Sequence, residues 1–230
     1  MGTTRSDLHR LSAHILARRR YDVTGHFGLR ASPGGLCTPA FGPEPETLRL
    51  DGTALVREVG TSASSARVNG ATLRELAAFA GVDLDAAFSA GAATPPVEPI
   101  DEPLDLDAAE LTGLVEWFDL GWRVLDDIVC ELGPTATPAT VQLWPEHFDV
   151  GTSVASGSGP GRVNLGFSPG DALSDEPYVY VGPQGRERPG DDGFWNAPFG
   201  AFRVRSGAGG ASGAAAFIRD GLARLEKAEG

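Results

Sequence analysis

The sequence has a single lysine, Lys227, and this scarcity excludes two classes of site. A Schiff base with a carbonyl substrate or with pyridoxal phosphate needs a lysine amine inside a pocket. A Walker A loop needs a lysine that reaches the nucleotide phosphates. We therefore expect neither a pyridoxal phosphate Schiff base nor a Walker A nucleotide site. The abundance of arginine, alanine and glycine is typical of a high-GC genome.

Cysteine and long apolar runs are also scarce. Cys37 and Cys130 are far apart and follow no metal-ligand spacing, which favours two reduced thiols in a cytoplasmic protein. No apolar run approaches the roughly 20 residues that span a bilayer. The first twenty residues lack the apolar core and cleavage site of a secretory signal. We therefore predict a cytoplasmic location.

Positive charge is in the minority, because 19 Lys and Arg residues face 31 Asp and Glu residues, giving a net charge of −12. Such a balance repels phosphate backbones and anionic lipid headgroups. We therefore expect neither nucleic acid nor a membrane as a partner. The carboxylates are spread along the chain, which argues against a mimic of nucleic acid. Composition leaves the oligomeric state open.

Hydrophobic periodicity predicts an α+β fold in which antiparallel sheet packs against one long central helix, with helices at both termini. The central helix is expected over residues 107–132, with Asp107 as its N-cap. Turn signals separate the short β-rich runs, most clearly the Asp51-Gly52 hairpin. The other expected helices cover residues 6–19, 69–81 and 211–227, and the expected strands cover 21–31, 36–41, 47–50, 54–59, 140–144, 162–167, 178–181 and 201–205.

The domain organisation has two interpretations. A chain of 230 residues suits a single domain over residues 1–230. Alternatively, two parts, residues 1–86 and 105–230, are joined by a proline-rich and acidic surface linker over residues 87–104.

The first helix ends in three arginines, Arg18, Arg19 and Arg20. Cations in a last turn favour the negative end of the helix dipole. The triplet indicates either an anion site or a solvated helix end, and the pattern favours the second.

The densest group of chemically distinctive side chains lies at residues 144–149, Trp-Pro-Glu-His-Phe-Asp. If the strand continues past Pro145, His147 and Asp149 share one face, and Glu146 points to the other face with Trp144. A carboxylate beside an imidazole suits a general base or a metal ligand. The alternative is that proline ends the strand, Trp144 and Phe148 pack in the core, and the polar side chains bond to nearby backbone.

Other polar and aromatic residues are candidates for the same pocket. His26 lies on the polar face of its expected strand, and a metal site would need it to converge with His147 and a carboxylate. Further candidate ligand-binding residues are Asn164, Glu176, Trp195 and Asn196. Residues 166–170 match the G-x-S-x-G nucleophile elbow, but Pro169 lacks the N–H that an oxyanion hole needs, so Ser168 is expected in a turn.

The second half of the chain resembles an uncharacterised bacterial family of unknown function. The resemblance rests on LWPEHFD at residues 143–149, NLGFSPGD at 164–171 and EPYVYV at 176–181. It covers roughly residues 140–225 and implies no activity. The family signature is Leu-Trp-Pro-His-His-Phe-Asp, so Glu146 stands where the family has its first histidine. A site with two histidines in this segment is therefore excluded here.

These patterns lead to two hypotheses for an unknown function. The first is a small cytoplasmic protein that binds a small molecule, and could be an enzyme, in a pocket around Trp144–Asp149. There His147 would act as base or metal ligand, Asp149 would orient it, and Trp144 and Trp195 would form walls. The alternative is a non-catalytic interaction or scaffold protein in which this stretch is structural core.

Overall fold

The computed structural model describes residues 3–155, 161–184, 188 and 193–227 of the chain. It divides into two compact units, which we describe separately. Unit 1 comprises Met1–Glu116 with Leu143–Phe148, and unit 2 comprises Trp117–Gln142 with Asp149–Gly230. The fold class is α+β, as predicted, and the strands form two antiparallel sheets. The boundary between the units falls within the long helix, after Glu116.

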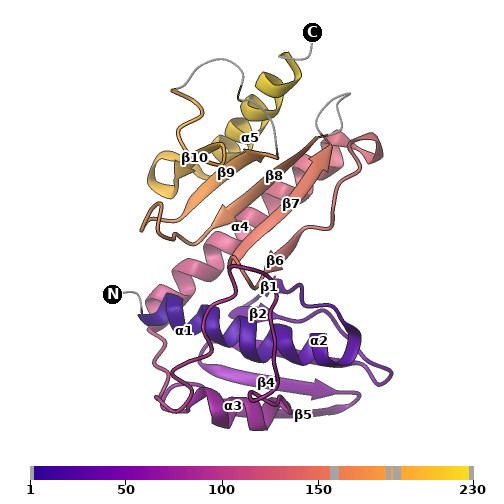
Figure 1. Ribbon diagram of the computed structural model, residues 1–230, viewed down its shortest axis with the longest axis vertical. Coiled ribbons are helices and arrows are strands. Elements are labelled where there is room, and N and C mark those ends of the chain that lie inside the picture. Colours follow the sequence, from indigo (N-terminus) through magenta and orange to yellow (C-terminus); the bar gives the residue numbers. More distant parts are fainter. Residues whose placement is uncertain (1–2, 156–160, 185–187, 189–192, 228–230) are drawn as a thin grey trace. The chain divides into compact units, whose positions relative to one another are not determined.

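Unit 1 is one long helical segment, a five-stranded sheet and a short helix (Figure 1). The sheet is a meander in the order β1-β2-β3-β4-β5. Its elements are α1 (Thr3–Leu11), η1 (Ser12–Ala17), α2 (Arg18–Thr24), β1 (Arg30–Ser32), β2 (Gly35–Cys37), β3 (Glu46–Asp51), β4 (Ala54–Val59), β5 (Ser62–Arg67) and α3 (Leu73–Ala80).

The helical segment extends further than the periodicity predicts. Leu8, Leu11 and Ile15 are at most 1% exposed, which confirms the predicted apolar stripe. Its middle turn, Ser12–Ala17, is a π-helix. The helix ends only at Gly25, whose φ of 73° gives the left-handed cap. The predicted strand over residues 21–31 is therefore wrong for its first part, because the backbone stays helical until a glycine allows it to turn.

The sheet of unit 1 confirms the Asp51-Gly52 hairpin, with Asp51 paired to Ala54. Glu46, Leu48 and Leu50 alternate with more exposed residues along β3 and are buried. Strand β5 was not predicted, because its Ser-rich sequence shows no apolar alternation and its side chains are mostly exposed.

Unit 2 is a second sheet, in the order β10-β9-β8-β7-β6, with α4 and α5 on one of its faces (Figure 1). A Cβ added at Gly121 of α4 would lie 2.6 Å from Phe167, and one at Gly221 of α5 would lie 3.0 Å from Val181, so both helices pack closely on the strands. The elements that follow α3 are α4 (Ala108–Leu132), η2 (Pro134–Ala136), β6 (Gln142–Trp144), β7 (Asp149–Ala155), β8 (Arg162–Ser168), β9 (Tyr178–Pro183), β10 (Ala201–Val204), η3 (Arg205–Gly207) and α5 (Gly210–Lys227). Of these, α4 up to Glu116 and the last two residues of β6 belong to unit 1.

The central helix α4 begins as predicted, because Asp107 Oδ1 accepts hydrogen bonds from the backbone N–H groups of Ala109 and Glu110. Its buried face includes Trp117, 2% exposed, whose indole N–H donates to the Ser168 carbonyl at 2.8 Å. Among the described residues, no helix is long and apolar enough to cross a membrane.

Candidate functional site

The distinctive motif forms a tight turn between β6 and β7. The Phe148 backbone N–H donates to the Trp144 carbonyl at 2.7 Å, which closes an α-turn. Phe148 has a φ of 56°, which is unusual for a bulky residue and strains the backbone. The geometry in which a strand continues past Pro145 is therefore wrong, and the alternative, that proline ends the strand, is confirmed.

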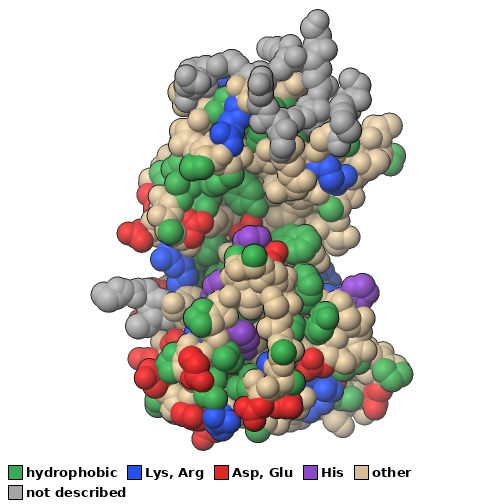
Figure 2. Space-filling view, viewed as in Figure 1, with side chains coloured by type: hydrophobic (Ala, Val, Ile, Leu, Met, Phe, Trp, Pro, Cys, Tyr) green, Lys and Arg blue, Asp and Glu red, His purple; other side chains and the backbone are tan. Residues whose placement is uncertain are grey.

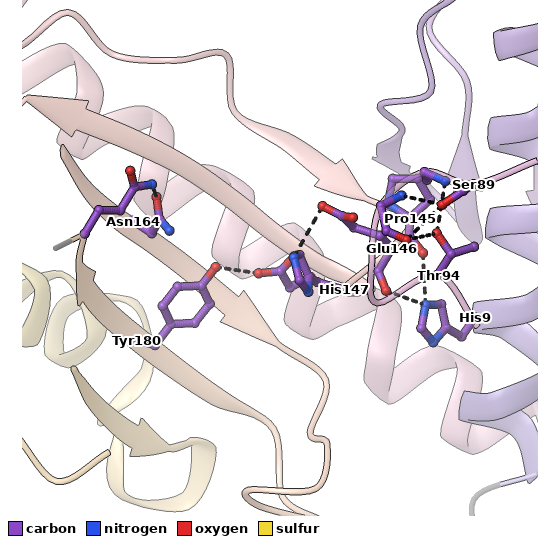
Figure 3. Close-up of polar contacts among 12 residues, drawn as sticks. His9, Ser89, Thr94, Pro145, Glu146, His147, Asn164 and Tyr180 are labelled. Carbon is purple, nitrogen blue, oxygen red and sulfur yellow. Dashed lines mark hydrogen bonds and ion pairs between the residues drawn. The ribbon is translucent and has the colours of Figure 1, made fainter. Parts of the chain in front are cut away.

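His9 of α1 holds this turn in place. Its Nε2 lies 2.9 Å from the Pro145 carbonyl oxygen and 3.2 Å from the Glu146 carbonyl oxygen (Figure 3). Because both partners only accept, Nε2 carries the proton. The imidazole stacks on the Phe148 ring, with centroids 5.0 Å apart and planes 12° apart. Burial lowers the pKa of His9, against the opposing effect of the two carbonyls, and the charges of His14 and His147 lower it further. A neutral, stacked imidazole therefore fastens the turn to the helix.

His147 points away from this packing. Its side chain is 58% exposed, and its Nε2 lies 3.3 Å from Glu146 Oε1. The Glu146 carboxylate in turn abuts the turn around Gly91, because a Cβ at Gly91 would lie only 1.2 Å from Glu146 Oε2. Thr94 Oγ1 closes that turn by donating to the Gly91 carbonyl at 2.7 Å (Figure 3). Within unit 1, Glu146 therefore braces a segment that is distant in sequence.

Asp149 belongs to unit 2 and has a different partner. It is 6% exposed, and its Oδ2 accepts a hydrogen bond of 2.5 Å from the Tyr180 hydroxyl. Burial raises the pKa of Tyr180 well above its ordinary value, and the Asp149 carboxylate adds to the effect. The Tyr180 ring crosses Gly166, where a Cβ would lie 2.4 Å from it. The carboxylate that sequence reasoning assigned to His147 thus has a tyrosine hydroxyl as its partner.

The remaining candidate residues have local structural partners. Asn164 accepts from Gln184 Nε2 at 2.7 Å, and Glu176 Oε1 accepts from the Ser206 N–H at 2.5 Å. The Asn196 side chain pairs with both backbone groups of Phe202, at 2.9 and 3.1 Å.

The two aromatic candidates each contact a phenylalanine in their own unit. Trp195 is 8% exposed and contacts Phe194 edge-on, with ring centroids 4.9 Å apart. The Trp144 ring centroid lies 6.3 Å from that of Phe27.

A metal centre finds no support in the described ranges, where no group of three or more His, Cys, Asp or Glu side chains is placed to hold an ion. His26 is exposed and lies in the connection after α2, not on the strand where it was expected. Ser168 ends β8 and its Oγ accepts from the Gly170 N–H at 3.2 Å, so it is a buried turn residue and not an elbow nucleophile.

Within unit 1, residues 86–99, most of which fall in the surface linker expected over 87–104, are held by side chains from one face of the first helix. Arg10 donates to the carbonyls of Val97, at 3.0 Å, and Pro99. His14 Nε2 lies 2.8 Å from the Pro95 carbonyl oxygen, and Arg18 donates to the Ala86 carbonyl. These three helix side chains are 8%, 4% and 3% exposed. Their spacing of four residues places them in one row along the helix.

Between this row and the fastened segment lies a cavity of 530 Å³ that sequence reasoning missed. Figure 1 shows the segment between α3 and α4 crossing the helix, and Figure 2 shows histidine side chains on the viewed face. The helix contributes His14 and Arg18 to the lining. The other lining residues are Leu84, Ala86, Ala87, Phe88, Ser89, Gly91, Ala92, Thr94, Pro95, Pro96 and Val97. The arginine triplet at the end of the first helix was the one sequence signal for this cavity. The favoured interpretation, a solvated helix end, is wrong for Arg18, which is buried.

The two buried polar side chains of the cavity have unsatisfied nitrogens. Because the Pro95 carbonyl only accepts, His14 Nε2 carries the proton, and its buried Nδ1 is a lone pair without a partner. Burial lowers the pKa of His14, opposed by the Pro95 carbonyl, and the charges of Arg18 and Arg10 lower it further. The Nε of Arg18 is also buried without a partner. The cavity therefore pairs one unsatisfied acceptor with one unsatisfied donor.

Comparison with known proteins gives no further guide, since no family model, curated protein or solved structure matches this chain. The resemblance of residues 140–225 to an uncharacterised bacterial family stays a prediction.

Proposed function

We propose that unit 1 binds a small organic molecule in the cavity between the first helix and residues 84–97. The observation that carries this proposal is a cavity of 530 Å³ lined by two side chains, His14 and Arg18, that are at most 4% exposed. Small-molecule sites have volumes of about 300–1,000 Å³ and combine apolar walls with a few convergent polar groups. Buried polar atoms are normally satisfied, so orphaned nitrogens beside a cavity support a role in binding.

The distinctive motif has an indirect role in this proposal. Glu146 abuts Gly91, which lines the cavity, and His9 fixes the turn that carries Glu146. The motif therefore shapes the wall of the site rather than lining it. The proposed site therefore differs from the pocket predicted from the sequence, in which His147 acts as a base. The exposure of the His147 side chain supports placing the site elsewhere.

The packing of the motif also supports the second candidate function, a non-catalytic scaffold. Phe148 is 2% exposed and stacks on His9, as a core residue would. We further propose a cytoplasmic location, supported by the free thiols of Cys37 and Cys130. The absence of nucleic acid and membrane partners stays a prediction from charge.

A fragment screen by saturation-transfer NMR tests the binding proposal, using two adjacent alanines as a matched pair. Ala92 lines the cavity, whereas Ala93 does not, and both are exposed. We expect fragments to bind the wild type and Ala93→Trp but not Ala92→Trp, whose indole would occupy the cavity. Fragments that bind all three proteins equally, or a wild type that binds none, would contradict the proposal and favour the scaffold.

A further inference from the structure

Arg18 is a buried cation without a carboxylate partner. It is 3% exposed and, among the described residues, no ion pair joins it to an acid. Two other arginines of the helical segment have a carboxylate, because Arg10 pairs with Asp7 and Arg19 pairs with Glu46, whereas Arg20, like Arg18, donates to a backbone carbonyl. Burying a charge is unfavourable unless an opposite charge or sufficient hydrogen bonds compensate it. Arg18 therefore lacks a counter-charge that the chain supplies to other arginines of the same helix.

The surroundings of Arg18 favour an anion that comes from outside. Of the described side chains that line the cavity, none is acidic, and Arg18 is the single charged one. Asp83 and Asp85 lie next to this wall in sequence but do not line the cavity, and both are exposed. The cavity is thus a positively charged site in a protein whose net charge is −12.

The rest of the lining selects among anions. Phe88 lies under the Arg18 guanidinium, 5.5 Å from its central carbon, and most other lining residues are Leu, Ala, Pro and Val, although the accessible lining includes slightly more polar than apolar surface. An inorganic anion would leave the apolar part of this lining uncovered, whereas an organic acid would cover it.

We propose that the ligand of this cavity is a small organic carboxylate with an apolar body, which ion-pairs with Arg18. This inference rests on the proposed function, since it names the ligand class of the same cavity. One terminal nitrogen of the guanidinium donates to the Ala86 carbonyl, which leaves the other terminal nitrogen as the donor for the carboxylate.

The test is a titration with matched acids and amides on the full chain. Benzoate, phenylacetate, phenyllactate and isovalerate are each compared with their primary amides by isothermal titration calorimetry. We expect the acids to bind at least about tenfold more tightly than the amides, because charge-assisted hydrogen bonds are the stronger ones. Arg18→Gln should remove this preference and Arg18→Lys should retain part of it. Arg74→Gln, an exposed control that changes the net charge equally, should leave it intact.

Each other result overturns the inference. Equal affinity of acids and amides for the wild type, or a preference that survives in Arg18→Gln, would show that Arg18 does not select the ligand. If none of the acids binds, the carboxylate assignment is wrong. In all three cases the fragment screen with Ala92→Trp and Ala93→Trp still decides whether the cavity binds small molecules. Circular dichroism spectra establish whether the Arg18 variants are folded. If Arg18→Gln is unfolded, Arg18→Lys replaces it in the titrations, and an unchanged preference for acids in a folded variant counts against the inference.

Discussion

Replacing Glu46 by Gln should destabilise unit 1, because its carboxylate joins the first helix to the sheet. Glu46 is 5% exposed. Arg19 donates to both of its oxygens, at 3.0 and 2.8 Å, and Arg57 donates to Oε1 at 2.9 Å. Burial alone would raise the pKa of Glu46, but the hydrogen bonds from the two arginines outweigh it and lower the pKa below its ordinary value.

The expected loss follows from the exposure of the partners. Removing one member of a buried ion pair costs about 3–5 kcal/mol. The side chains of Arg19 and Arg57 are 20% and 28% exposed, so solvent screens part of the effect. We therefore expect Glu46→Gln to lower the free energy of unfolding by about 2–3 kcal/mol. The matched control is Glu58→Gln on the neighbouring strand, whose side chain is 45% exposed and which should lose no more than about 0.5 kcal/mol.

Urea denaturation at several pH values, followed by circular dichroism, measures this difference. A lowered acid pKa contributes stability that is present above the unfolded value, about 4.3, and is lost as pH falls through the folded value. The gap between wild type and Glu46→Gln should therefore be full at pH 7 and should shrink below about pH 4.3. A gap under about 1 kcal/mol at pH 7, or one that does not change with pH, would show that Glu46 does not stabilise unit 1 through its ion pairs.

Three further predictions concern stability. Gly91→Ala should cost about 1–3 kcal/mol, because φ is 150° there and the new Cβ would meet Glu146 Oε2, and an unchanged melting temperature would argue against this packing. Gly166→Ala should cost about 1–3 kcal/mol by pushing the Tyr180 ring off the strand, and a wild-type melting temperature would contradict the contact. Since the pKa of His14 is lowered, the unfolded state binds more protons, so stability should fall as pH drops below about 6.5. His14→Asn should reduce that slope in urea titrations, and an unchanged slope would place the proton elsewhere.

The parts of the fold that depend on local pattern could be predicted from the sequence. The 107–132 helix carries a continuous apolar stripe and an N-cap aspartate, and both are present in α4. The hairpin at Asp51-Gly52 has a turn signal that suits its geometry. Each of these features is fixed by residues within a few positions of one another.

The predictions that were missing or wrong concern features that depend on contacts between residues far apart in the sequence. Strand β5 forms because its backbone pairs with β4, although its side chains are exposed and carry no alternation. The turn at residues 145–148 is held by His9, which is more than 130 residues away in sequence. The prediction that His147 and Asp149 share one strand face was wrong because no local pattern shows that His9 holds this turn.

The cavity illustrates the same limit for the candidate site. Its walls come from one helix face and from residues 84–97, which carry no period and read as a linker. The contacts that join them link side chains of Arg10, His14 and Arg18 to backbone carbonyls 68 to 89 residues away. Backbone carbonyls leave no trace in composition or motif, so no sequence pattern predicts that these segments meet.

The most direct test of the cavity as a binding site is NMR of the histidine rings. The chain has four histidines, and His14→Asn assigns the ring signals of His14. On addition of a fragment or carboxylate that binds, we expect the ring nitrogen signals of His14 to shift, whereas those of exposed His26 should stay unchanged. A binder that leaves His14 unperturbed, or that shifts His26 instead, would show that the ligand lies outside this cavity.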